Sequence, residues 1–81
     1  MTTDHIKKIK ELIVEKLGVA EPEIKEEASF EKDFGVDSLD VYELLTEIED
    51  EFNLSISDED ADNITTVGLL FNYVNKHAGI W

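Results

Sequence analysis

The fold is decided by residues 35–52, which read Gly35-Val36-Asp37-Ser38-Leu39-Asp40-Val41-Tyr42-Glu43-Leu44-Leu45-Thr46-Glu47-Ile48-Glu49-Asp50-Glu51-Phe52. Within this stretch, apolar side chains recur at the spacing of a single helix face that packs on a core. They are Val41, Leu44, Leu45, Ile48 and Phe52. The glycine turn at position 35 precedes this pattern. The stretch therefore predicts a helix over residues 37–52 that begins at an exposed turn.

Working outward, the rest of the chain predicts two longer helices and one short one. The pattern over residues 3–17 is helical, with apolar positions Ile6, Ile9, Leu12, Ile13 and Leu17. A cap at Ser57 followed by acids predicts a short helix that ends near Asn63. Thr65 or Thr66 caps a last helix that stops around Gly79, with apolar positions Val67, Leu70, Phe71, Val74 and Ala78. The prediction is a single all-α domain over residues 1–81, a small four-helix bundle.

A long connection joins the first two predicted helices. Residues 19–36 show no sustained period, and Pro22 interrupts any early helix. Five apolar residues are the candidates to hold this segment on the core: Val19, Ile24, Phe30, Phe34 and Val36. Ser29–Lys32 resembles a single capped turn. We expect an ordered loop.

Composition excludes several classes of function. The chain has 81 residues, a formal net charge of −13 and no cysteine. Such an acidic surface disfavours nucleic acid and anionic membranes and favours basic protein partners. The lack of cysteine excludes disulfides and zinc–thiolate sites. Without a signal peptide or an apolar run of transmembrane length, a cytoplasmic protein with no membrane insertion is expected. We also expect a monomer.

The start of the central helix is the candidate functional site. If Asp37 is the N-cap, Asp40 falls at N3 and the pair resembles a capping box. Ser38 is then the first helical residue, with its hydroxyl directed outward. Leu39 and Tyr42 lie off the core stripe, which suggests contact with a ligand or partner. The simpler alternative is that Asp37-Ser38 is only a helix start.

These residues resemble the prosthetic-group site of acyl carrier proteins. Gly35-Val36-Asp37-Ser38-Leu39-Asp40, followed by Glu43-Leu44-Leu45, carries the likeness. It extends over essentially the whole chain through Leu17-Gly18-Val19, Ala28-Ser29-Phe30, Ile56-Ser57-Asp58-Glu59 and Ile64-Thr65-Thr66-Val67. It is closest to the free-standing bacterial carriers of fatty acid synthesis.

The resemblance implies a non-catalytic carrier with a covalent 4′-phosphopantetheine, which a phosphopantetheinyl transferase attaches from coenzyme A. It implies that Ser38 bears the arm, flanked by Asp37 and Leu39. Basic patches of that transferase and of fatty acid synthesis enzymes would dock on Asp40, Tyr42, Glu43, Thr46, Glu47, Glu49, Asp50, Asp58 and Glu59. The acyl chain would lie in a cavity walled by Leu44, Leu45, Ile48, Ile56, Ala61, Ile64 and Leu70. Ordinary core packing is the alternative for each of these seven.

One residue of the central predicted helix departs from the pattern of the family. Tyr42 stands where the family commonly has a smaller aliphatic residue, so we expect it to alter partner docking or shielding of the arm. The alternatives to a fatty acid carrier are a specialised carrier for polyketide, peptide or other acyl transfer, and an unmodified acidic interaction module.

Asp58, Asp60 and Asp62 imitate the start of an EF-hand loop. The rest of that loop's pattern is missing, so no metal site is expected. No catalytic set of nucleophile, base and orienting residue is apparent.

Overall fold

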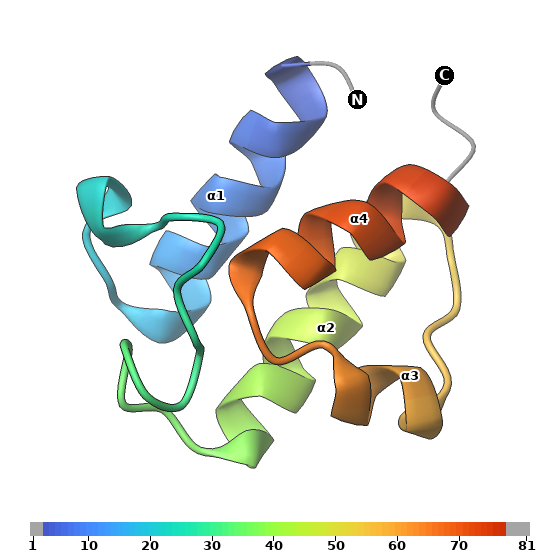
Figure 1. Ribbon diagram of the computed structural model, residues 1–81. Helices are drawn as coiled ribbons and strands as arrows, with labels where there is room; N and C mark the ends of the chain where they lie inside the picture. Colours follow the sequence, from blue (N-terminus) through green and yellow to red (C-terminus); the bar gives the residue numbers. More distant parts are fainter. Residues whose placement is uncertain (1–2, 78–81) are drawn as a thin grey trace.

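The observed helices agree closely with the predicted ones. The computed structural model describes residues 3–77 and contains α1 (Thr3–Leu17), the 3₁₀ turn η1 (Glu21–Glu23), α2 (Ser38–Phe52), α3 (Asp58–Asn63) and α4 (Val67–His77) (Figure 1). In this part of the chain the only β pairing is an isolated bridge between Ser29 and Thr66. The all-α bundle of three longer helices and a short one is confirmed. The expected stop at Gly79 and the core position Ala78 lie outside the described residues.

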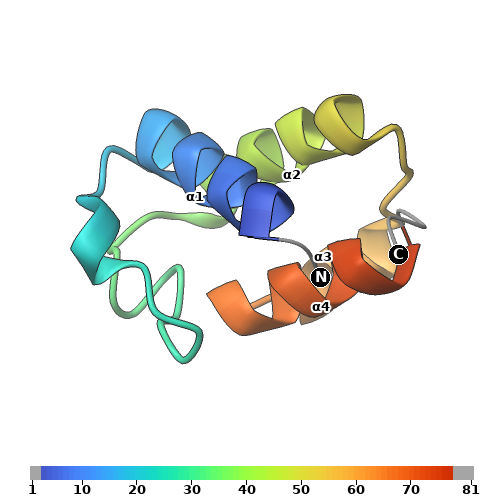
Figure 2. The same ribbon diagram turned by 90° about the horizontal axis from the view of Figure 1, so that it is seen from above.

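The helices form two layers around one core. Figure 2 shows α1 and α2 side by side, with α4 and the short α3 across from them. The predicted stripes supply the interior: Ile9, Ile13, Leu44, Ile48, Val67, Leu70 and Val74 have no exposed surface. Val41 and Phe52, at the ends of the α2 stripe, are only partly buried. The central part of each stripe is therefore the core.

The connection between α1 and α2 is ordered, as expected, and its backbone is tied to the start of α4. The N–H of Phe30 donates to the carbonyl of Thr65 (3.1 Å), that of Val67 to Ala28 (3.1 Å) and that of Gly68 to Glu26 (2.8 Å). Ile24, Ala28 and Phe30 are buried. These bonds and contacts fix the loop beside the start of α4.

Of two local features of this connection, one was predicted from the sequence and the other was not. The capped turn at Ser29–Lys32 is present, because the Ser29 hydroxyl accepts from the N–H of Lys32 at 3.2 Å. The 3₁₀ turn η1 was not predicted. Pro22 lies in its first turn, where a missing N–H and a fixed φ are tolerated. The proline therefore starts a short turn of helix, whereas α1 ends before it at Leu17, where Gly18 adopts a left-handed conformation with φ +68°.

Candidate functional site

The first turn of α2 has the predicted capping arrangement. Asp37 is the N-cap, with φ −92° and ψ 177°, and its carboxylate accepts the N–H of Asp40 at 3.1 Å. Gly35 has φ +68°, a left-handed conformation that glycine adopts without steric penalty. The turn and the cap together make Ser38 the first helical residue, and this residue is exposed.

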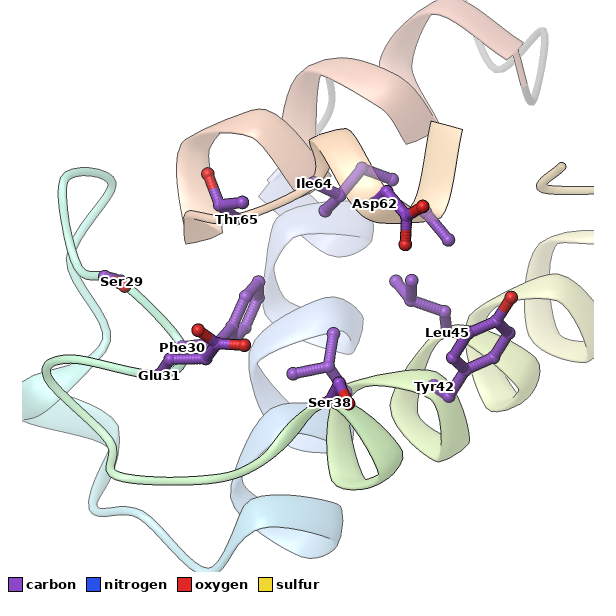
Figure 3. A pocket seen from close by; sticks show the side chains of 11 residues that line it. Ser29, Phe30, Glu31, Ser38, Tyr42, Leu45, Asp62, Ile64 and Thr65 are labelled. Atoms are coloured by element: carbon purple, nitrogen blue, oxygen red, sulfur yellow. The ribbon is translucent and has the colours of Figure 1, made fainter. Parts of the chain in front are cut away.

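A pocket of about 200 Å³ opens beside Ser38. Figure 3 shows Ser38 at its rim, with Phe30 and Glu31 from the loop on one side and Tyr42 and Leu45 from α2 on the other. Val41, Ala61, Asp62, Ile64, Ser29 and Thr65 complete the lining. Apolar surface predominates in it. The pocket thus lies between α2, α3 and the loop, and it begins at the serine.

The expected cavity residues divide into two groups. Leu45, Ala61 and Ile64 line the pocket. Leu44, Ile48 and Leu70 are fully buried in the core, and Ile56 is partly buried against it. The pocket is therefore shallower than the sequence suggested, because the middle of the bundle is already filled by side chains.

Sequence reasoning missed the side of the pocket that the loop supplies. Ser29, Phe30 and Glu31 precede Ser38 by seven to nine positions, and their place depends on the hydrogen bond from Phe30 to Thr65. No periodic pattern reports such a contact. Phe30 is a large apolar residue among polar neighbours, and this was the indication in the sequence that part of the loop packs against the rest of the protein.

Tyr42 is more constrained than its place off the core stripe implied. It is 42% exposed, its ring lines the pocket, and its hydroxyl donates to Asp58 Oδ1 at 2.5 Å. This hydrogen bond, with a smaller contribution from desolvation, raises the pKa of Tyr42 above its ordinary value of 10.0. Tyr42 thus links α2 to the first residue of α3.

A second tyrosine holds α3 from the other side. The hydroxyl of Tyr73 on α4 lies 3.1 Å from Asp60 Oδ2 and 3.2 Å from the carbonyl oxygen of Ser55. Burial, followed by the hydrogen bond to Asp60, raises the pKa of Tyr73. Because α3 has no buried residue of its own, these polar contacts contribute substantially to its position.

The residues expected to meet partners do not form one uniform face. Leu39 is 65% exposed, and Glu43, Thr46, Asp50, Asp58 and Glu59 are also exposed. Asp40 is partly buried. Glu47 lies 3.3 Å from Lys16 on α1. Glu49 accepts the N–H of Ile56 at 2.7 Å. Glu47 and Glu49 therefore have contacts within the bundle as well as surface charge.

The chemistry of the site suits a phosphate-linked arm that carries an apolar group. The first turn of a helix presents backbone N–H groups without intrahelical partners, and the helix dipole favours an anion there. The adjoining lining offers apolar side chains beside the serine. Within residues 3–77, no helix is long and apolar enough to cross a membrane, and no group of three or more His, Asp or Glu side chains is placed to hold a metal.

Comparison with known proteins agrees with this chemistry. Residues 7–74 match the family model described as "Phosphopantetheine attachment site". The fold matches the solved structure of the acyl carrier protein from Enterococcus faecalis with a TM-score of 0.78 and 32% sequence identity. That match covers 94% of this chain and 98% of the other. The chain therefore belongs to the acyl carrier protein family, and its function is to carry acyl groups on a phosphopantetheine cofactor.

Proposed function

We propose that Ser38 is the residue that bears 4′-phosphopantetheine and that this carrier serves fatty acid synthesis. The observation that supports Ser38 is its position: the exposed first residue of α2, at the rim of a largely apolar pocket. The arm supplies the thiol that holds acyl groups as thioesters. The chain itself has no cysteine, so the thiol that bears the acyl group has to come from the arm.

Attachment of the arm is a single phosphoryl substitution. The Ser38 Oγ attacks the phosphorus next to pantetheine in coenzyme A. An Oγ–P bond forms, the pyrophosphate P–O bond breaks, the adenosine bisphosphate leaves and the serine proton is released. The exposure of Ser38 suits a reaction performed by a separate transferase. The first turn of α2 places N–H groups near the resulting phosphodiester, which offsets repulsion from Asp37 and Asp40.

The acidic surface around Ser38 is the proposed docking site for enzymes with basic patches. Among the expected contact residues, Leu39, Glu43, Asp50 and Glu59 are exposed, and their side chains make no hydrogen bond or ion pair within residues 3–77. A net charge of −13 speeds encounter with basic partners. We propose a phosphopantetheinyl transferase and fatty acid synthesis enzymes as those partners, and a monomer as the docking species.

Mass spectrometry tests the attachment site. After incubation with coenzyme A and a broad-specificity phosphopantetheinyl transferase, the wild type gains one phosphopantetheine and Ser38→Ala gains none. Ser55→Ala is the matched control: Ser55 is another exposed serine whose carbonyl, rather than hydroxyl, accepts from Tyr73. It gains one group like the wild type. An unmodified wild type, or a modified Ser38→Ala, contradicts the proposal.

Complementation tests the pathway. Expression of the chain in bacteria depleted of their fatty acid synthesis carrier restores growth if the proposal is correct, whereas Ser38→Ala does not. A chain that is modified on Ser38 but fails to restore growth is instead a specialised carrier for polyketide, peptide or other acyl transfer.

A further inference from the structure

The short helix α3 forms the wall of the pocket that has the least support from the core. None of its residues is buried, and Ala61 is only partly buried against the core. Ala61 and Asp62 line the pocket, and Figure 3 shows Asp62 across from Tyr42 and Leu45. It also carries four acids, Asp58, Glu59, Asp60 and Asp62, next to the acidic α2. Like charges across this boundary disfavour close approach of the two helices. Specific contacts must therefore hold α3 against α2.

On the pocket side, that contact is the hydrogen bond between Tyr42 and Asp58. The hydroxyl of Tyr42 donates to Asp58 Oδ1 at 2.5 Å, while the ring of the same tyrosine lines the pocket. Asp58 precedes Ala61 and Asp62 by three and four residues, so all three side chains lie on one side of α3. The bond consequently joins the two walls of the pocket.

Space behind the pocket is already occupied. Leu44, Ile48 and Leu70 have no exposed surface, and a close-packed interior does not admit additional atoms without rearrangement. A chain attached at Ser38 and longer than the pocket therefore needs room from its movable wall. Moving α3 away from α2 breaks the hydrogen bond between Tyr42 and Asp58.

We propose that the Tyr42–Asp58 hydrogen bond is a latch between α2 and α3 that limits the length of acyl chain the pocket holds, which makes Tyr42 a specificity-determining residue. This inference rests on the proposed attachment at Ser38. In this proposal Tyr42 acts inside the carrier, where it limits the length of the acyl chain that the pocket retains. Its hydroxyl, which bonds to Asp58, is the physical reason for a tyrosine at this position.

The first experiment uses the protein without its arm. Hydrogen exchange of the α3 amides reports opening of this helix. Loss of this hydrogen bond in Tyr42→Phe accelerates exchange about fivefold. Asp58→Ala has the same effect, and the double variant adds little because both changes remove one bond. Unchanged α3 exchange in Tyr42→Phe overturns the latch.

The control for Asp58→Ala is Glu59→Ala. Both residues are exposed acids in the first turn of α3, so both substitutions remove the same charge from the same helix end. Only Asp58 accepts a hydrogen bond from Tyr42. Glu59→Ala is therefore expected to exchange more slowly than Asp58→Ala. Equal exchange in the two variants shows that charge alone positions α3 and overturns the inference.

The second experiment uses protein loaded on Ser38 with saturated acyl chains of increasing length. Each methylene buried in the pocket stabilises the folded state, so the unfolding temperature rises until the pocket is full. We expect this limit at a longer chain in Tyr42→Phe and Asp58→Ala than in the wild type and Glu59→Ala. A common limit in all four overturns the latch alone. Failure to load the wild type overturns the proposed function and, with it, the chain-length role.

Discussion

At the scale of single residues, the start of α2 depends on one side-chain cap. The carboxylate of Asp37 satisfies the N–H of Asp40, one of the donors that every helix start leaves unpaired. This bond places Ser38 at the first helical position, where its hydroxyl is accessible. The cap is local in sequence, and its contribution can be measured separately from its charge.

Asp37→Ala is expected to lower the free energy of unfolding by about 1 kcal/mol, the usual contribution of an N-cap side chain. Asp37→Asn is the control, because it removes the same charge and retains a good cap. Urea denaturation measures both. Equal midpoints for the two variants would show that the charge of Asp37, rather than its hydrogen bond, determines the effect.

The two tyrosine–aspartate bonds make stability depend on alkaline pH. The pKa values of Tyr42 and Tyr73 are raised above 10.0 in the folded chain, so the unfolded chain ionises first as pH rises. Their stabilising contribution is fully present below pH 10.0 and is lost as pH rises through the folded pKa values.

We therefore expect the difference in free energy of unfolding between the wild type and the double variant Tyr42→Phe/Tyr73→Phe to be constant below pH 10 and to shrink above it. Chemical denaturation across this range measures the difference, and the contributions of side chains common to both proteins cancel from it. A difference that stays constant or grows above pH 10 would contradict the assignment.

At the scale of secondary-structure elements, the connection from α2 to α3 is fixed by the end of α2. Asn53 adopts a left-handed conformation with φ 53°, which asparagine tolerates better than most residues. Four residues earlier, the Glu49 carboxylate accepts the N–H of Ile56 at 2.7 Å. The side chain of Glu49 thus holds the connection that leads into α3.

Glu49→Ala leaves the partly buried N–H of Ile56 without its partner and is expected to lower the free energy of unfolding by about 1–2 kcal/mol. The neighbouring Asp50→Ala removes the same charge from an exposed position and should leave stability nearly unchanged. Thermal and urea denaturation compare the two variants.

The variants Glu49→Ala and Asp50→Ala also distinguish an effect on stability from an effect on partner docking. If Asp50 belongs to the partner surface, Asp50→Ala slows association with a basic partner enzyme while stability is preserved. Equal destabilisation by the two substitutions would show that the Glu49–Ile56 bond contributes nothing specific.

At the scale of the whole molecule, repulsion among acids opposes folding. The repulsion that comes with a formal net charge of −13 is opposed, among the described residues, by exposed ion pairs such as Lys8–Glu51 at 3.9 Å and Lys16–Glu47 at 3.3 Å. Exposed pairs of this kind contribute little. Salt therefore screens more repulsion than attraction in this protein.

The unfolding temperature is expected to rise when salt is added, as the Debye length falls from about 30 Å at 0.01 M to about 10 Å at 0.1 M. Glu27→Lys, at an exposed loop position, removes one negative charge, adds one positive charge and so changes the net charge from −13 to −11. It should show a smaller rise. Calorimetry compares the two proteins, and a fall in unfolding temperature with salt would contradict this account.

Local patterns along the chain were sufficient to predict the four α-helices and the position of Ser38. In α1, α2 and α4 the apolar side chains recur three or four positions apart. The caps at Asp37, Ser57 and Thr66 each accept a backbone N–H from three positions further along the chain, and the structure contains all three of these hydrogen bonds. Such interactions act within one helix, so the order of residues is sufficient to predict them.

The pocket, by contrast, is formed by contacts between residues far apart in the sequence. Phe30 reaches it because the loop pairs with Thr65, Tyr42 is tied to Asp58 sixteen residues away, and Glu49 bonds to Ile56 beyond the end of α2. It also decided that Leu44, Ile48 and Leu70 fill the core, whereas Leu45 lines the cavity. These outcomes depend on how separate elements pack together. The periodicity of apolar residues within one helix carries no information about which residues of another element it contacts.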